Sequence, residues 1–174
     1  MTDPQESAAC EVAHGHGSAQ VTDRTLVAAF ASPVADFLLH FASDAGFRVV
    51  LLEPNPALAG AAPAASYPVT SDATDYLDET ADVVVTDHHR PEIGIVLRDA
   101  LASKARWVGI MGNPRHPAPH IPALTGLGVP EAEIVRVHRP IGLNIGSRTP
   151  AEIAIATLAG LIADRNGRSG GFAF

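Results

Sequence analysis

The sequence predicts an α/β fold of the doubly wound, Rossmann-like type, with a mainly parallel sheet of about five strands and helices on both faces. Three observations support this prediction. Short apolar runs of strand length alternate along the chain with longer segments of helical periodicity. Residues 25–53 read as strand, helix and strand, which is the β-α-β unit of a nucleotide-binding half. The segment from Arg139 to Ala163 then combines a glycine-bearing loop with a strongly capped apolar helix.

The first unit begins with an apolar run over residues 25–31, which suits a central parallel strand. Pro33 opens a helix of about three turns, and Ser32 is its expected N-cap. Residues 47–53 form the second strand, which ends at Glu53. An acidic residue at this place can hydrogen-bond a ribose hydroxyl in dinucleotide-binding folds.

The turn between the first strand and its helix departs from the glycine-rich phosphate fingerprint. It reads Phe30-Ala-Ser-Pro-Val-Ala35, so Phe30 and Ser32 occupy positions where glycines allow a tight bend and close approach of a pyrophosphate. We expect the phenylalanine side chain to obstruct that approach, and Pro33 removes one N–H donor. The turn therefore predicts weak or absent binding of NAD, NADP and FAD.

The remaining elements continue the alternation. Residues 54–80 favour either a crossover with one short helix near 74–79 or a long loop over a sheet edge. The last helix begins at Pro150, where Thr149 is the N-cap and Glu152 completes a capping box. Between these segments we expect strands over 81–86, 106–111 and 134–138, and helices over 91–102 and 118–127.

Composition limits the class of protein. The chain has 174 residues, of which 47% are hydrophobic, so one domain with a substantial core is expected. The formal charge is −7, from 12 basic and 19 acidic residues, and no basic run suggests a nucleic-acid binder. No signal peptide or membrane span is visible, and a single cysteine allows no intramolecular disulfide, so we expect a cytoplasmic protein without a membrane partner.

The two ends of the chain read as tails. Residues 1–24 are polar and rich in small residues, and residues 166–174 are glycine-rich, so both are expected to be mobile. Cys10 reads as an ordinary thiol, because nothing around it would depress its pKa. The pair His14 and His16 lacks a third ligand nearby, and we predict no metal site.

Polar residues follow three of the predicted strands, at what should be one edge of the sheet. In open parallel sheets, ligands bind outside the carboxyl ends of the strands. Adjacent His88 and His89 should point in opposite directions on an extended backbone, so they are not expected to share a metal. Asp87 and His89 could instead form an acid–base pair, but no nucleophile motif accompanies them.

We also expect a phosphate site at the start of the last helix, at the same edge of the sheet, because the free N–H groups of a helix N-terminus readily bind a phosphate. The residues that we predict to bind a ligand are His89, Asn113, Arg115, His116, Asn144, Gly146, Ser147, Arg148 and Thr149.

The motif Pro140-Ile-Gly-Leu-Asn-Ile-Gly-Ser-Arg-Thr-Pro-Ala-Glu-Ile-Ala154 resembles the C-terminal signature of the xanthine dehydrogenase accessory protein family (XdhC/CoxI). The resemblance extends backwards through Val108-Gly-Ile-Met-Gly112 and Val85-Thr-Asp-His-His89 to Leu26. It identifies residues 25–165 as a domain of the family's C-terminal, Rossmann-like type. The family's first turn usually reads Gly-Ala-Gly-His-Val-Ala, and this chain departs from it at Phe30, Ser32 and Pro33.

The resemblance implies a role in maturing molybdenum hydroxylases of the xanthine dehydrogenase or CO dehydrogenase type. Members of the family bind the molybdenum cofactor (molybdopterin), work with a cysteine desulfurase during its sulfuration, and deliver it to the apo-enzyme. In that family an additional N-terminal domain precedes the Rossmann part and carries a functionally important cysteine. In this sequence Cys10 lies in a tail that we expect to be too short to replace that domain. We therefore expect a chaperone-like binding protein rather than an enzyme, working with a separate protein of the N-terminal type.

Two other functions stay open at the level of sequence, and so does a homodimer. An NAD(P)-dependent oxidoreductase is favoured by Glu53 and disfavoured by the turn at Phe30. A degenerate Rossmann module for protein–protein contact is favoured by the lost glycines and disfavoured by the retained motif over residues 140–154. All three functions use the same predicted fold, so the site has to decide between them.

Overall fold

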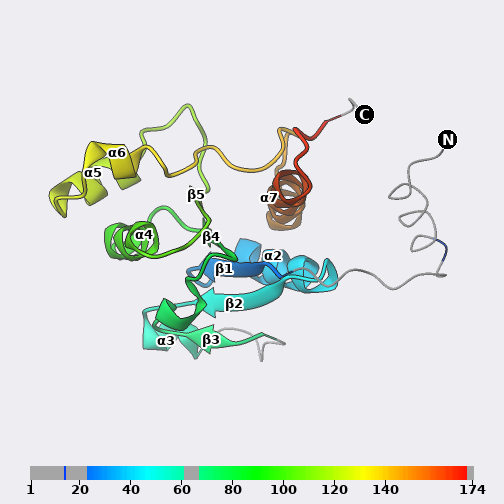
Figure 1. Cartoon of the computed structure of the whole chain (residues 1–174), viewed down its shortest axis with the longest axis horizontal. Coiled ribbons are helices and arrows are strands. Elements are labelled where there is room, and N and C mark those ends of the chain that lie inside the picture. The colour runs from blue at the N-terminus through cyan, green and yellow to red at the C-terminus, as the bar shows by residue number, and fades with distance from the viewer. Residues whose placement is uncertain (1–13, 15–22, 61–66, 172–174) are drawn as a thin grey trace.

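A parallel five-stranded sheet lies at the centre of the molecule, between helices on both of its faces (Figure 1). The structure is a computed structural model of the chain, and it describes residues 14, 23–60 and 67–171. The strand order is β3-β2-β1-β4-β5, so β1 is central and the fold class predicted from the sequence is confirmed. The strands are β1 (Thr25–Ala29), β2 (Arg48–Leu52), β3 (Val69–Thr70), β4 (Ala81–Val85) and β5 (Trp107–Ile110).

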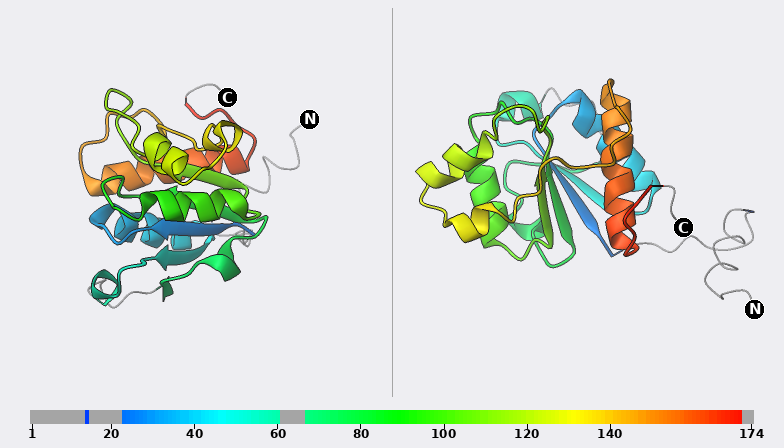
Figure 2. Two further views of the ribbon diagram at one scale, coloured as in Figure 1. Left: turned by 90° about the vertical axis from the view of Figure 1, so that its left-hand side faces the viewer. Right: turned by 90° about the horizontal axis from the view of Figure 1, so that it is seen from above.

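The helices form two layers. On one face α2 packs against α7, and on the other α4 lies beside α5 (Figures 1 and 2). Three shorter helical segments lie in the connections between the larger elements. The helices are α2 (Pro33–Asp44), α3 (Pro56–Ala59), the 3-10 turn η1 (Thr74–Tyr76), α4 (Ile93–Ala102), α5 (His120–Gly126), α6 (Glu131–Ile134) and α7 (Pro150–Arg165).

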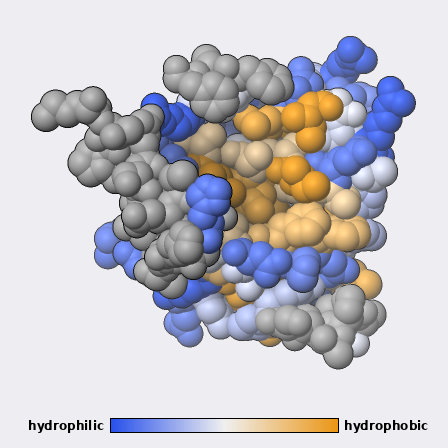
Figure 3. Space-filling model, turned by 90° about the vertical axis from the view of Figure 1, so that its right-hand side faces the viewer, coloured by the Kyte–Doolittle hydropathy of each residue, from blue (hydrophilic) through white to orange (hydrophobic). Residues whose placement is uncertain are grey.

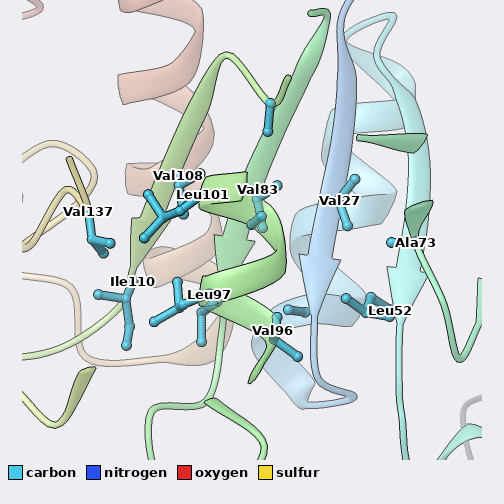
Figure 4. Packing of buried hydrophobic residues seen from close by; sticks show 14 of the residues in the cluster. Val27, Leu52, Ala73, Val83, Val96, Leu97, Leu101, Val108, Ile110 and Val137 are labelled. Atoms are coloured by element: carbon cyan, nitrogen blue, oxygen red, sulfur yellow. The ribbon is translucent and has the colours of Figure 1, made fainter. Parts of the chain in front are cut away.

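The core has two parts because successive side chains of a strand point to opposite faces of the sheet. In β1, Leu26 and Ala28 face the α2 and α7 layer, whereas Val27 and Ala29 face α4. Figure 4 shows the part of the core on the α4 side, where Leu97 from α4 lies beside Ile110 of β5. All of β1 and β4 is buried, as expected for central parallel strands.

Two of the predicted helix starts are confirmed by their capping contacts, whereas the helices predicted from residues 91 and 118 begin at Ile93 and His120. Ser32 Oγ accepts the Ala35 N–H at 3.1 Å, with Pro33 at the first helical position of α2. Thr149 and Glu152 form the capping box that opens α7. Local chemistry therefore places these two helices, which are the two that cover one face of the sheet.

The predicted strand over residues 134–138 is wrong. This segment continues from α6, whose start after Pro130 carries acidic residues that favour a helix N-terminus. Only His138 pairs with the sheet, through an isolated bridge to Gly109 in β5. Its ring also stacks on Trp107, with centroids 5.0 Å apart. The fifth strand is instead β3, at the opposite edge.

The long connection over residues 54–80 is a mixture of short elements. It contains α3, β3 and η1, and η1 is the short helix expected near residues 74–79. The predictions for Cys10, for the pair His14 and His16 and for most of the N-terminal tail fall largely outside the described residues. Among the described residues, none of the helices combines the length and the apolar character needed to span a bilayer.

Candidate functional site

The direction in which strands are added to the sheet reverses between β1 and β4. The chain first builds β1, β2 and β3 outward in one direction and then adds β4 and β5 on the other side of β1. Such a reversal leaves a crevice at the carboxyl ends of the strands, where ligands of open α/β sheets bind. Figure 2 shows that the segments after β1, β4 and β5 and the loop into α7 all lie at this end.

At the β1 side of this crevice, Phe30 adopts the left-handed conformation that a fingerprint glycine would take. Its φ is 77°, and its side chain is fully buried in the core beside α4. The expected obstruction therefore does not come from a phenyl ring that projects into the crevice. Arg90 lies next to this turn, with its Cζ 4.7 Å from the centre of the Phe30 ring.

Glu53, the acidic residue expected to meet a ribose, is already fully engaged. It is completely buried and accepts the N–H groups of Ala31 at 2.8 Å and Asn55 at 2.9 Å. Arg90 donates to both of its oxygens, at 2.9 and 2.8 Å. Burial acts to raise the pKa of Glu53, but the hydrogen bonds from Arg90, Ala31 and Asn55 outweigh it and hold that pKa below the usual range. The chain's own groups thus fill the side of the crevice formed by β1 and β2.

At the β4 side, His88 and His89 lie together in a turn. Asp87 Oδ1 accepts the His89 N–H at 2.9 Å, and the two imidazole rings have centroids 4.1 Å apart. The expectation that the two side chains point in opposite directions is wrong, because these residues form a turn and not an extended strand end. Among the described residues, no set of three or more His, Cys, Asp or Glu side chains is arranged to hold a metal ion.

Arg139 holds the loop that follows β5. Its Nη2 donates to the carbonyl oxygens of Asn113 at 2.8 Å and of His116 and Pro117 at 3.2 Å. The guanidinium lies against Gly112, since a Cβ there would be 2.8 Å from Arg139 Nε. Gly112 therefore makes room for the arginine that holds this loop.

The pKa of His88 responds to charged groups from both the turn after β4 and the loop after β5. The pKa of His88 is lowered first by burial and then by the charge of His89, with further lowering by Arg139 and His116. The Asp87 carboxylate acts in the opposite direction. His88 therefore senses charges from both the turn after β4 and the loop after β5.

Beneath the loop, His120 begins α5 and is 5% exposed. Burial lowers its pKa, and the charge of Arg139 lowers it further. Within the described part of the chain, its Nδ1 and the Nε of Arg139 are both buried without a hydrogen-bond partner. Buried polar atoms normally have partners, so these two atoms need an explanation.

The structure brings only part of the predicted set into this cluster. His89 and His116 lie at its surface, and Asn113 caps its own loop by accepting the Arg115 N–H at 2.9 Å. Arg115 is exposed on that loop. Asn144, Gly146, Ser147, Arg148 and Thr149 form the loop into α7 at the same end of the sheet (Figure 2).

Sequence reasoning missed the role of Arg139 and the place of His120. Arg139 follows a predicted strand and was visible as a polar residue, but its contacts with the loop after β5 depend on tertiary structure. His120 lies in a segment read only as helix, and no local pattern distinguishes it.

The start of α7 carries an anion of its own. Glu152 Oε2 accepts the N–H groups of Arg148 at 2.6 Å and Thr149 at 3.1 Å. These bonds lower the pKa of Glu152, with that from Arg148 the largest cause. An external phosphate at the same amides would have to displace the Glu152 carboxylate.

Comparison with known proteins adds a family. Residues 26–161 match the model of the XdhC Rossmann domain. "Uncharacterized protein YqeB" of Escherichia coli (strain K12) is 31% identical over 108 residues, which are 62% of this chain and 19% of that protein. A crystal structure of a xanthine dehydrogenase (BH1974) from Bacillus halodurans shares the fold, with a TM-score of 0.64 and 24% identity over 83% of this chain and 45% of that one. The chain thus spans less than half the length of either protein.

Proposed function

Because this chain belongs to the XdhC family through its Rossmann domain, we propose that it is an accessory protein in the maturation of a molybdenum hydroxylase of the xanthine dehydrogenase type. Its part is to bind the molybdenum cofactor, or a related phosphate-bearing ligand, and to present it to the apo-enzyme in the cytoplasm. A cysteine desulfurase and a protein of the family's N-terminal type are the further partners that we propose. Hydride transfer is not part of this function.

The observation that carries the proposal is the polar cluster at the ends of β4 and β5. The cofactor combines a terminal phosphate with a flat pterin that has hydrogen-bonding edges. Arg139 and the nearby imidazoles of His88, His89 and His116 suit an anionic group, and Asn113 lies on the loop that Arg139 holds. The buried, unpartnered Nε of Arg139 is a donor that a bound ligand could use.

The opposite side of the crevice argues against a nicotinamide cofactor. Glu53 has no free carboxylate oxygen for a ribose, since both oxygens accept hydrogen bonds from Arg90. The Ala31 N–H lies in the turn where a dinucleotide's pyrophosphate would bind, but it donates its hydrogen bond to Glu53. These contacts favour the accessory function over an NAD(P)-dependent oxidoreductase.

Retention of the cofactor tests the proposal. Purified protein is incubated with cofactor released from a donor molybdenum enzyme, separated from it by size, and assayed for oxidised pterin fluorescence. We expect pterin in the protein fraction, and a mixture with a non-binding protein of similar size is the control. Deletion of the gene should also lower hydroxylase activity while leaving the amount of hydroxylase polypeptide unchanged. No retained pterin together with unchanged hydroxylase activity would exclude the accessory function.

A protein-contact module is the second candidate, and one surface favours it. Apolar side chains gather on the face of the molecule that Figure 3 shows. Exposed apolar residues of α2 and α7 include Phe37, which is 41% exposed, and Ile155, which is 50% exposed. Exposed apolar patches on soluble domains often mark interaction sites. Co-elution with the apo-hydroxylase that is lost in Phe37→Asp, without any pterin retention, would favour this module.

A further inference from the structure

The ends of β4 and β5 gather groups that can carry positive charge, although the whole chain has a formal charge of −7. We name them the histidine cluster, and its members are His88, His89, His116, His120 and Arg139. His88 and His89 come from the turn after β4, and Arg139 holds the carbonyls of the loop that carries His116. Asp87, which precedes His88, is the carboxylate that acts on this imidazole in the opposite sense.

The positive charge of Arg139 is not matched by an acidic side chain. Among residues 23–60 and 67–171, its hydrogen-bond acceptors are three backbone carbonyls, all from the loop after β5. This contrasts with Arg90, which is fully paired with Glu53. A guanidinium fixed by carbonyls and lacking a carboxylate keeps its charge available to an anionic ligand.

Two buried nitrogens also lack partners in this cluster. Arg139 Nε and His120 Nδ1 are enclosed without a hydrogen bond to any described residue, and His120 as a whole is 5% exposed. Leaving buried donors unsatisfied costs free energy, and such sites are commonly completed by a ligand, an ion or water. The imidazoles of His89 and His116 are more exposed and can close over what binds there.

We propose that the histidine cluster is a proton-coupled site for an oxyanion, such as the phosphate monoester of a larger ligand. In the free protein, burial and then the charges of His89, Arg139 and His116 lower the pKa of His88, and the Asp87 carboxylate acts in the opposite direction. A bound dianion adds negative charge beside His88 and thereby favours its protonated form. Binding therefore takes up protons, and affinity rises as the pH falls through the range in which histidine titrates.

The anion site stands without the proposed function, which supplies only the identity of the ligand that carries the anion. It is also distinct from the phosphate site expected at the start of α7. There the Glu152 carboxylate already accepts hydrogen bonds from the Arg148 and Thr149 N–H groups. In the cluster, by contrast, the hydrogen bonds that Arg139 donates within the described residues go to backbone carbonyls and not to a carboxylate.

Sulfate is the probe of choice, because it stays a dianion over the whole pH range in which histidine titrates. Histidine ring signals are followed by NMR while sulfate replaces chloride at constant ionic strength, at pH about 6 and about 8. We expect saturable shifts of His88, His89 and His116, and a dissociation constant at least about fivefold lower at the lower pH. Non-saturating shifts shared by exposed His40 of α2, or an affinity independent of pH, would overturn the proposal.

Variants separate the cluster from general charge effects. The double variant His89→Gln/His116→Gln should weaken sulfate binding at least about tenfold, because it removes two imidazoles that can become cationic. The control is His40→Gln, since the His40 side chain is 67% exposed on α2, away from this loop. Arg139→Gln should also weaken binding, and the double histidine variant keeps the test valid if the loop rearranges in Arg139→Gln. Unchanged affinity in the double histidine variant would refute the site.

Competition distinguishes this inference from the proposed function. Saturable sulfate binding without any retained pterin supports the anion site and rejects the proposed cofactor. Retained pterin that is displaced by sulfate, and weakened in His89→Gln/His116→Gln, supports both. Retained pterin that is insensitive to sulfate and to these substitutions supports cofactor binding away from the cluster and rejects the anion site.

Discussion

Arg90 and Glu53 form a bidentate pair at the carboxyl ends of β4 and β2, with Nη1–Oε2 and Nη2–Oε1 distances of 2.9 and 2.8 Å. The Glu53 side chain is fully buried and that of Arg90 is 12% exposed. The pair lies beside the turn at Phe30, where a Rossmann domain would normally admit the phosphates of a nucleotide. We therefore expect the pair to contribute to stability and to disfavour a nucleotide at the same place.

Loss of this pair should strongly destabilise the fold. Arg90→Ala leaves the Glu53 carboxylate buried with two backbone N–H groups as its remaining partners, and we expect a loss of about 3–5 kcal/mol in unfolding free energy. Urea denaturation measures it. The control is Arg98→Ala, whose pair with Asp99 is about half exposed and should matter by less than about 1 kcal/mol. Similar midpoints for the two variants would contradict the prediction.

The lowered pKa of Glu53 predicts acid sensitivity. Because its folded-state pKa lies below the ordinary value of 4.5, the unfolded chain binds the proton more readily, and Glu53 stabilises the fold above that value. This contribution should be lost as the pH falls from about 4.5 through the lowered pKa. Denaturation of wild type and Glu53→Gln at several pH values tests it. The stability difference between them should shrink in acid, and a constant difference would be evidence against the assignment.

Dinucleotides should bind weakly or not at all. The Ala31 amide and both oxygens of Glu53 are engaged within the chain, and Pro33 has no N–H to offer. Titration calorimetry with NAD, NADP and FAD should show no dissociation constant in the low micromolar range, which would correspond to roughly −8 kcal/mol. A glycine-fingerprint dehydrogenase serves as the positive control. Micromolar binding by the wild-type chain would show that the crevice can open.

Two glycines before α7 should differ in their tolerance of a side chain. Gly142 has a φ of 83°, and a Cβ there would lie 2.9 Å from the Ala156 carbonyl carbon and the Thr157 nitrogen. Gly146 has a φ of 71° but no heavy atom within 4 Å of that position. Gly146→Ala should cost about 1–2 kcal/mol from backbone strain, and Gly142→Ala at least about 1 kcal/mol more from overpacking. Chemical denaturation should give different midpoints, and equal losses would mean that the contact with α7 relaxes freely.

The cap of α7 should be measurable on its own. Thr149→Ala removes the acceptor of the Glu152 N–H and should cost on the order of 1 kcal/mol. The matched control is Thr125→Ala on the exposed side of α5, where a helix interior tolerates alanine well. An unchanged denaturation midpoint in Thr149→Ala would show that the capping box contributes nothing to stability.

The sequence was most informative where structure is decided locally. Apolar runs of strand length and the caps at Ser32 and Thr149 predicted β1, α2 and α7, because propensity and capping act over a few residues. Residues 134–138 have an apolar, β-branched pattern, but Pro130 and the acidic residues after it begin a helix just before them. In that segment, local helix signals outweighed strand propensity.

The candidate site was harder to predict because its contacts join distant parts of the chain. Nothing in the sequence indicates that Arg90 pairs with Glu53, 37 positions earlier, or that Arg139 binds the carbonyls of residues 113–117. The local sequence was enough to predict that Glu152 caps α7. That its carboxylate occupies the amides of Arg148 and Thr149, where a phosphate was expected, became clear only from the structure. The predicted edge was a sound guide, whereas the partners of each side chain required the fold.

The isolated bridge at His138 also covers part of one edge of the sheet, the outer side of β5. Both edges of the sheet offer few free backbone groups to a strand of another molecule. At one edge β3 has two residues, and at the other the outer side of β5 is bridged to His138. The stacked rings of Trp107 and His138 shield the same border. Short and shielded borders discourage strand-to-strand addition between molecules. The backbone hydrogen bonds of His138 with Val108 and Ile110 therefore leave less of the free β5 edge for another chain to pair with.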